Sequence, residues 1–212
     1  MYVLFLFSFF FISLIFHYPN NSYGKPGVEF HYEFEDHQLE KILFVPKRGQ
    51  LVILCSDHSI HLLQVSHQLE KGIVQPLHTN TYFVAEDESD ASPNKSVTAI
   101  ALNSSGNVLY VGTKSGNIHQ LNTNNLELEK QVISQDTILK SIGEDLKKPG
   151  SVEVIEEHPN DPDNLLIGYS RSLIVLWDNQ NKNVLKYYTF LKVRTSNFMI
   201  FTKSCVIFMK PF

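Results

Sequence analysis

The stretch Val152–Asp178, VEVIEEHPNDPDNLLIGYSRSLIVLWD, decides the fold class of this 212-residue chain. It contains three apolar runs, and the two breaks between them are rich in Pro, Asn, Asp and Ser. Apolar runs of strand length that are bounded by turn-forming residues indicate β-strands joined by tight connections. We therefore expect three consecutive strands here, with one turn over His158–Pro162 and a second turn near Ser170.

The same plan occurs twice more upstream. Leu39–Val65 reads LEKILFVPKRGQLVILCSDHSIHLLQV, and Val97–Thr123 reads VTAIALNSSGNVLYVGTKSGNIHQLNT. Each copy opens with a short apolar strand and a polar turn, followed by a second strand that is almost wholly apolar, a small-residue turn and a third strand. The three copies start 58 and 55 positions apart. Internal repetition at such a period indicates an array of similar units.

The repeat predicts an all-β, WD40-like β-propeller fragment, with about three four-stranded blades in an incomplete ring. Inner propeller strands are covered on both faces by neighbouring blades, which accounts for the apolar second strands. The third copy ends in the dipeptide Trp177–Asp178, where the first two copies hold Leu63 and Leu121. The period exceeds the ~40–45 residues of a WD40 repeat, and we assign the excess to polar connections over 79–95 and 136–150.

One segment breaks the β pattern. Between Asp136 and Lys148, apolar residues recur at the spacing of one helix face, namely Ile138, Leu139, Ile142 and Leu146. This spacing predicts one or two helical turns inside the second long connection.

The two ends of the chain do not match its middle. Residues 1–16 read MYVLFLFSFFFISLIF, without a charge. The run lacks the positive start and cleavage site of a signal peptide and is shorter than the ~20 residues of a membrane-spanning helix. Translated intron, a signal or anchor, and an ordinary strand all stay open. We expect an apolar leader over 1–23, non-native or signal-like, a partial propeller over 24–190, and an irregular non-native tail over 191–212.

The composition limits the classes of function and the cellular compartment that we expect. Hydrophobic residues make up 43% of the chain and the net charge is -4, so no strong electrostatic pull toward nucleic acid is expected. The two cysteines, Cys55 and Cys205, are too few and too far apart for a disulfide framework, and they fit a reducing compartment. Cys55 lies in an apolar run, where a free cysteine acts as a small hydrophobe.

No pattern in the chain indicates catalysis. His58 and His61 are three residues apart, but no third metal ligand follows at suitable spacing. Lys114–Gly116 is expected to form a hairpin tip, because the glycine-rich run of a phosphate-binding loop is absent before the lysine. A G-x-S-x-G nucleophile motif is also absent. We therefore predict no catalytic residue, metal site, cofactor or small-molecule substrate.

The third copy resembles a known family. Glu157–Pro162, Leu166–Arg171 and Ile174–Asp178 resemble the EHP-x-DP, LIGYSRG and VVLWD segments of the lethal giant larvae family. Three upstream stretches also resemble family segments in the right order: 26–30 (PGVEF), 111–116 (VGT-x-x-G) and 135–142 (QDEVLQSLP). The resemblance covers about 24–188. Ser172 departs from it, because the family usually has Gly there, and Asn179 replaces a common Leu.

The resemblance implies a non-enzymatic scaffold in cell polarity, the cortical cytoskeleton and regulated exocytosis. The partners that it implies are non-muscle myosin II, the Par6 and atypical protein kinase C complex, and syntaxin-type SNARE proteins. The implied location is the cytoplasm and cell cortex, peripheral to the plasma membrane. The family's phosphorylated basic loop lies in a second propeller and has no counterpart here. Signature residues with an expected structural role are Gly168, Tyr169, Ser170, Arg171, Trp177 and Asp178, with Arg171 in a turn and Trp177 in the core.

Two alternatives stay open. A tomosyn-like regulator that binds syntaxin and other SNARE proteins shares the propeller plan and a similar LIGY strand. A secreted or membrane-anchored β-protein is favoured if residues 1–16 form a working signal. In every case three blades cannot close a ring, and exposed blade faces and edges favour association. We therefore expect residues 24–190 alone to be aggregation-prone or partly unfolded.

Overall fold

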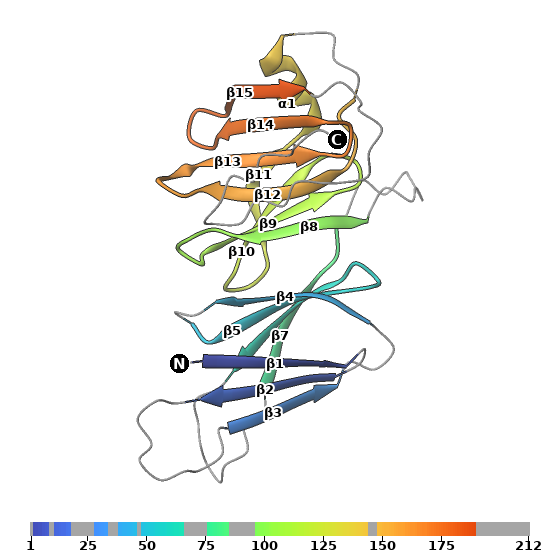
Figure 1. Ribbon diagram of the computed structural model, residues 1–212, viewed down its shortest axis with the longest axis vertical. Helices are drawn as coiled ribbons and strands as arrows, with labels where there is room; N and C mark the ends of the chain where they lie inside the picture. Colours follow the sequence, from blue (N-terminus) through green and yellow to red (C-terminus); the bar gives the residue numbers. More distant parts are fainter. Residues whose placement is uncertain are drawn as a thin grey trace, which may run out of the picture. The chain divides into compact units, whose positions relative to one another are not determined.

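The computed structural model describes residues 2–8, 11–17, 28–33, 38–45, 48–65, 76–84, 96–143 and 148–189. These residues form antiparallel sheets and one short helix (Figure 1). The chain divides into two compact units, one with residues 1–87 and 123–127 and the other with residues 88–122 and 128–212. We describe each unit by itself.

The first unit contains two sheets. One is three-stranded, in the order β1-β2-β3, with β1 (Tyr2–Ser8), β2 (Phe11–His17) and β3 (Val28–Glu33). The other is four-stranded, in chain order, with β4 (Leu39–Val45), β5 (Gln50–Cys55), β6 (Ile60–Val65) and β7 (Pro76–Tyr82). The apolar stretch near the start of the chain therefore forms two paired strands. Whether it is native sequence stays a prediction.

The second unit contains two four-stranded sheets. One has the order β11-β10-β9-β8, with β8 (Val97–Leu102), β9 (Val108–Thr113), β10 (Ile118–Asn122) and β11 (Leu128–Ile133). The other runs in chain order through β12 (Val152–His158), β13 (Asp161–Tyr169), β14 (Leu173–Asp178) and β15 (Asn183–Thr189). The three sequence copies thus correspond to three four-stranded antiparallel sheets, and the predicted all-β class is confirmed.

The predicted helix is present as α1 (Gln135–Ile142). The Ser134 hydroxyl caps its first turn by accepting a hydrogen bond from the Thr137 amide (3.1 Å). Gly143 ends the helix in a left-handed conformation and donates to the Leu139 carbonyl. Ile138 is fully buried, and the Ser141 hydroxyl accepts from the Val184 amide of β15 (2.9 Å). The helix therefore covers part of the open edge of β15.

Two predicted connections are shorter than expected. Residues 79–82 belong to β7, where Thr81 pairs with His61, because the free edge of β6 offers backbone partners to a β-favouring Thr and Tyr stretch. The turn predicted over His158–Pro162 consists of residues 159 and 160, since β12 ends at His158 and β13 begins at Asp161.

Burial of the second strands differs among the three sheets. All six residues of β5 are buried, and five of the six in β9 are. In β13, Leu165 and Ile167 are buried but Leu166 between them is partly exposed. The prediction that the second strand is buried on both faces is therefore wrong for the third copy. The reason is alternation: successive side chains point to opposite faces, and the second face of this sheet remains partly accessible.

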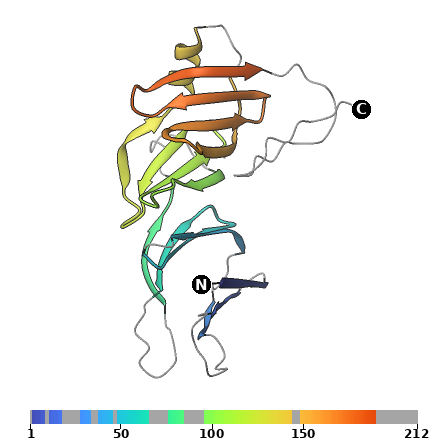
Figure 2. The same ribbon diagram turned by 60° about the vertical axis from the view of Figure 1, so that its left-hand side comes forward.

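The two sheets of the second unit pack together through β12, which lies beside β8 (Figure 2). The Thr98 hydroxyl of β8 donates to the Val152 carbonyl of β12 (2.6 Å). Gly112 of β9 approaches Val152 so closely that a Cβ there would lie 2.6 Å from Val152 Cγ1. A glycine is therefore required where the two sheets meet.

Candidate functional site

Three hairpin tips share one backbone geometry. The connections β5–β6 and β9–β10 have four residues and β13–β14 has three, and the third residue of each adopts a left-handed conformation: His58 (φ 66°), Gly116 (φ 88°) and Ser172 (φ 62°). Their amides donate to the carbonyls of Cys55, Thr113 and Tyr169 at 2.9, 3.0 and 3.2 Å. A tight turn followed by a left-handed residue is a common way to connect two hairpin strands. This geometry explains why glycine suits the position of Ser172.

The tip of β13–β14 holds the chain that enters β12. The Ser170 amide donates to the Ser151 carbonyl (2.9 Å), and the Ser151 amide donates to the Ser170 hydroxyl (3.1 Å). The Arg171 amide donates to the Pro149 carbonyl, and its guanidinium donates to the Lys148 carbonyl, both at 3.1 Å. These signature residues therefore fix a neighbouring loop in place.

The tip of β9–β10 contacts β13 and the same loop before β12. The buried Tyr169 hydroxyl donates to the Gly116 carbonyl (3.4 Å), and burial raises the pKa of Tyr169. A Cβ at Gly116 would lie 2.7 Å from the Gly150 carbonyl oxygen. Residues Lys148–Ser151 were not predicted to belong to this cluster, although Pro149–Gly150 is a turn signal that could have indicated it.

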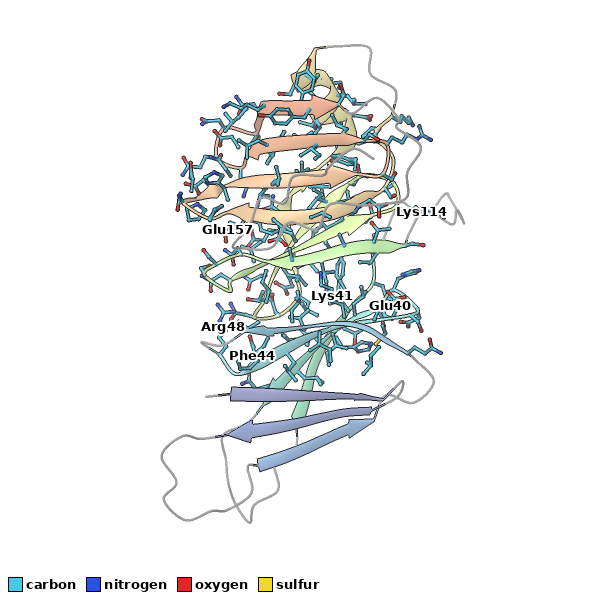
Figure 3. The ribbon with its side chains drawn as sticks, in the orientation of Figure 1. Glu40, Lys41, Phe44, Arg48, Lys114 and Glu157 are labelled. Carbon is cyan, nitrogen blue, oxygen red and sulfur yellow. The ribbon has the colours of Figure 1, made fainter. Side chains whose placement is uncertain are left out.

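We call residues 114–116, 148–151 and 170–172 the loop-end surface. It carries three exposed cationic side chains, Lys114, Lys148 and Arg171. Glu153, whose carboxylate accepts from the Ser151 hydroxyl (2.6 Å), is an exposed anion near it. Figure 3 shows Lys114 at this end of the second unit and Glu157 at the other end. Rigid strands hold these loops, so the surface suits recognition of a charged partner segment.

The contacts of Trp177 and Asp178 stabilise the fold. Trp177 is 1% exposed and lies in the core that joins the two sheets of the second unit. The Asp178 carboxylate accepts from the Asn181 amide (2.8 Å), the Asn181 side chain (2.8 Å) and the Gln180 amide (2.9 Å). The Asn181 bonds, above all, lower the pKa of Asp178. This carboxylate therefore caps the β14–β15 turn.

His61 of the first unit lies in a hydrogen-bonded network. The Ser59 hydroxyl donates to the Asp57 carboxylate (2.6 Å) and lies 2.8 Å from His61 Nε2. Because a hydroxyl has one proton and a carboxylate only accepts, His61 Nε2 must donate to Ser59. The imidazole therefore does not act as a base toward this hydroxyl, and Ser59 itself is fully buried. The arrangement does not activate a nucleophile.

The described residues contain no group of three or more His, Cys, Asp or Glu side chains arranged for a metal ion. Cys55 is a buried free thiol whose pKa burial raises to about 11, so it is protonated at neutral pH and poorly reactive. Cys205 and the acidic run 86–90 lie outside the described residues. Within the described part of the chain, no helix has the length and apolar character needed to cross a membrane.

The chain has relatives among well-characterised proteins, although no protein-family model matches it. It is 37% identical to LLGL scribble cell polarity complex component 2 of Mus musculus over 172 residues, which is 78% of this chain and 16% of that protein. Over 172 residues it is 35% identical to lethal(2) giant larvae protein homolog 1 of the same species (76% of this chain, 16% of that protein).

The Drosophila melanogaster lethal(2) giant larvae protein is 36% identical over 95 residues, covering 44% of this chain and 8% of that protein. Among solved structures, the C-terminal WD40 domain of Sif2 gives a TM-score of 0.49 at 13% identity, covering 71% of this chain and 37% of that chain. The chain spans about a sixth of the length of the two mouse relatives. By this shared sequence, the chain belongs to the lethal giant larvae family.

Proposed function

We propose that the chain is a non-enzymatic interaction scaffold that acts in cell polarity, the cortical cytoskeleton and regulated exocytosis. The proposed partners are non-muscle myosin II, the Par6 and atypical protein kinase C complex, and syntaxin-type SNARE proteins. The proposed location is the cytoplasm and the cell cortex, peripheral to the plasma membrane. The observation that carries the proposal is the 172-residue match to LLGL scribble cell polarity complex component 2.

The loop-end surface supports a binding role. Backbone hydrogen bonds from Ser170 and Arg171 hold it in place, so its loops lose little conformational entropy when a partner binds. Its exposed cations, Lys114, Lys148 and Arg171, suit an acidic segment of a partner protein. Contacts of this type weaken as salt screens the charges.

The test is a binding assay with the full 212-residue chain immobilised on a biosensor. Purified syntaxin-type SNARE protein, a non-muscle myosin II tail and the Par6–kinase complex are each titrated over it. We expect saturable binding of at least one partner and weaker binding in high salt. The double variant Lys114→Glu/Arg171→Glu should weaken that binding about tenfold or more, because it places acidic charges opposite an acidic segment.

The matched control is Lys140→Glu/Lys182→Glu, which reverses two exposed lysines of the same unit outside the loop-end surface. It should leave binding unchanged, with circular dichroism confirming that both variants fold. No binding of any partner contradicts the proposal, and an equal loss in the control contradicts the role of this surface. Binding of the SNARE protein alone favours the tomosyn-like alternative.

A further inference from the structure

The second unit is acidic at the end of its sheets that lies away from the loop-end surface. Figure 3 shows Glu157, the next-to-last residue of β12, at this end and Lys114 at the other. The Glu157 carboxylate accepts hydrogen bonds from the Ser104 amide and from the Ser104 hydroxyl (3.3 Å), so it joins β12 to the β8–β9 turn. Because side chains alternate along a strand, Asp163 belongs to the same sheet face as Leu165, which is buried in the core and pairs with Glu157.

Two buried polar side chains of β9 and β10 belong to the same place. Tyr110 pairs with Gln120, so the two residues share one face of their sheet. Tyr110 is 3% exposed and packs in the core between the two sheets, and Gln120 is 4% exposed. The Gln120 side chain donates to the Asn179 side chain of the β14–β15 turn (3.0 Å), and the Asn179 amide donates to the Asp163 carbonyl (2.8 Å). These bonds bring the buried pair to the acidic part of the second sheet.

The pKa of Tyr110 reflects both its burial and the negative charges around its hydroxyl. Burial above all, and then the charges of Glu157, Glu129 and Asp163, raise the pKa of Tyr110 to about 12. The hydroxyl therefore keeps its proton at neutral pH, and its oxygen has lone pairs that can accept hydrogen bonds. We call Tyr110, Gln120, Glu129, Glu157 and Asp163 the acidic end.

The acidic end has acceptor atoms without donors, and charges without counter-ions, among the described residues. There the Tyr110 hydroxyl has no hydrogen-bond partner, although the side chain is almost completely buried. Glu129, Glu157 and Asp163 form no ion pair with a cationic side chain in this part of the chain. Glu129 and Glu157 are partly buried, and burial of a charge without a counter-ion is unfavourable. A cationic ligand would remove this penalty and supply donors to the acceptor atoms.

The chemistry of these groups selects the kind of cation. A metal ion is disfavoured, because the described residues contain no group of three or more His, Cys, Asp or Glu side chains arranged to hold one. An arginine guanidinium has five N–H donors in a planar fork, and it binds carboxylates through paired hydrogen bonds. A lysine ammonium has fewer donors and is more strongly hydrated, so it loses more on entering a partly buried place. We propose that the acidic end binds an arginine side chain from a basic segment of a partner protein.

Each group has a defined part in this binding. Glu157, which Ser104 holds in place, accepts from the guanidinium, and the Tyr110 oxygen accepts a further N–H. Asp163 is exposed and extends the negative charge toward solvent, which favours other basic residues of the same segment. The inference is independent of the loop-end surface, which has the opposite charge and shares no residue with the acidic end.

The test is fluorescence polarisation of a short labelled peptide that alternates arginine and serine, titrated with the full 212-residue chain. We expect saturable binding that weakens in high salt. The same peptide with lysine in place of arginine should bind at least about threefold more weakly, because an ammonium lacks the guanidinium fork. Glu157→Gln should weaken binding of the arginine peptide about tenfold, since it removes the charge from a charge-assisted hydrogen bond.

Tyr110→Phe separates binding from folding. It should weaken binding of the arginine peptide about fivefold, because the acceptor oxygen is lost. Its melting temperature should not fall, since the hydroxyl has no partner among the described residues of the folded chain. A lower melting temperature with unchanged peptide binding would show a structural role for this hydroxyl and overturn the proposal.

The matched controls are Glu153→Gln, which makes the same change at the exposed other end of β12, and Tyr188→Phe, which removes a hydroxyl from an exposed tyrosine. Neither should change the affinity for the arginine peptide, and melting curves check that every variant folds. The proposal also fails if the arginine peptide does not bind, if the lysine peptide binds equally well, or if the controls weaken binding as much as the variants of the acidic end.

Discussion

Gly112 of β9 and Gly168 of β13 occupy equivalent positions in two consecutive sheets but have opposite surroundings. Each pairs with the first or second residue of the next strand, Gly112 with Ile118 and Gly168 with Ile174. At Gly112 a Cβ would lie 2.6 Å from Val152 Cγ1, whereas at Gly168 a Cβ would make ordinary contact at 3.5 Å. The same residue in the same place is thus required in one sheet and tolerated in the other.

The difference shows what a neighbouring sheet adds. Gly112 lies where β12 covers its own sheet, so the glycine sets how closely two sheets approach. Gly168 lies on the partly accessible face of the sheet β12–β15, where an added Cβ would make ordinary contact with Val154. The same repeat position can therefore have different surroundings in consecutive sheets, because the contacts that another sheet makes with it differ.

The strongest test of this comparison is Gly112→Ala against Gly168→Ala. We expect Gly112→Ala to lower the free energy of unfolding by about 2 kcal/mol, because Val152 is branched at Cβ and cannot move away easily. Gly168→Ala should leave the free energy unchanged or raise it by about 0.5 kcal/mol, because alanine restricts the unfolded chain. Urea denaturation of both variants measures the difference. Equal losses would show that the two positions are not distinct.

The next test concerns the link between the two hairpin tips. Tyr169→Phe should lower the free energy of unfolding by about 1 kcal/mol, since it removes the donor to the Gly116 carbonyl in a buried place. Tyr188→Phe is the control, because Tyr188 is 56% exposed and lies two strands away in the same sheet. Thermal melts followed by circular dichroism compare the two. A loss for Tyr188→Phe as large as that for Tyr169→Phe would contradict the link.

The third test replaces Ser172, the residue with a left-handed backbone conformation at the tip of β13–β14. Ser172 has the same conformation as Gly116, and side chains other than glycine are disfavoured there. Ser172→Gly should therefore raise the free energy of unfolding by about 0.5 kcal/mol. Ser170→Gly, two residues earlier, should lower it, because the Ser170 hydroxyl accepts from the Ser151 amide. The same denaturation assay measures both, and a loss of stability in Ser172→Gly would contradict the geometry.

The smallest expected effect is a pH dependence of the stability that Asp178 gives to the β14–β15 turn. Asp178 corresponds to Asn122 of the preceding sheet, because Trp177 pairs with Leu165 as Leu121 pairs with Leu109. The pKa of Asp178 is lowered from 3.8 in the folded chain, so its contribution is present above pH 3.8 and is lost as pH falls through the lower value.

Asp178→Asn copies the uncharged residue of the other sheet. The difference in melting temperature between the original chain and this variant should therefore shrink as pH falls from 5 through 3.8 and below. Melts at stepped pH measure it. A difference that is constant over this range would show that the ionised carboxylate does not stabilise the turn.

The sequence predicted the all-β class and the three four-stranded sheets, because turn residues and apolar runs act locally, but it did not predict the three-stranded sheet β1-β2-β3. The helix after Ser134 was also predictable, since one apolar face recurs at helical spacing. The contacts of Ser170 and Arg171 with residues 148–151 were not predictable, because they join segments about twenty residues apart through backbone atoms. One-sided burial of β13 was missed for a similar reason, since an apolar strand does not reveal which of its faces is covered.

The most direct test of the account is a double-mutant cycle between Gly112 and Val152. If β9 and β12 meet at this contact, then Val152→Ala makes room for the methyl group of Gly112→Ala, and the second substitution should cost much less in that background. Urea denaturation of the four chains gives the coupling energy. We expect a coupling of at least about 1 kcal/mol. A coupling near zero would contradict the close packing of these two sheets.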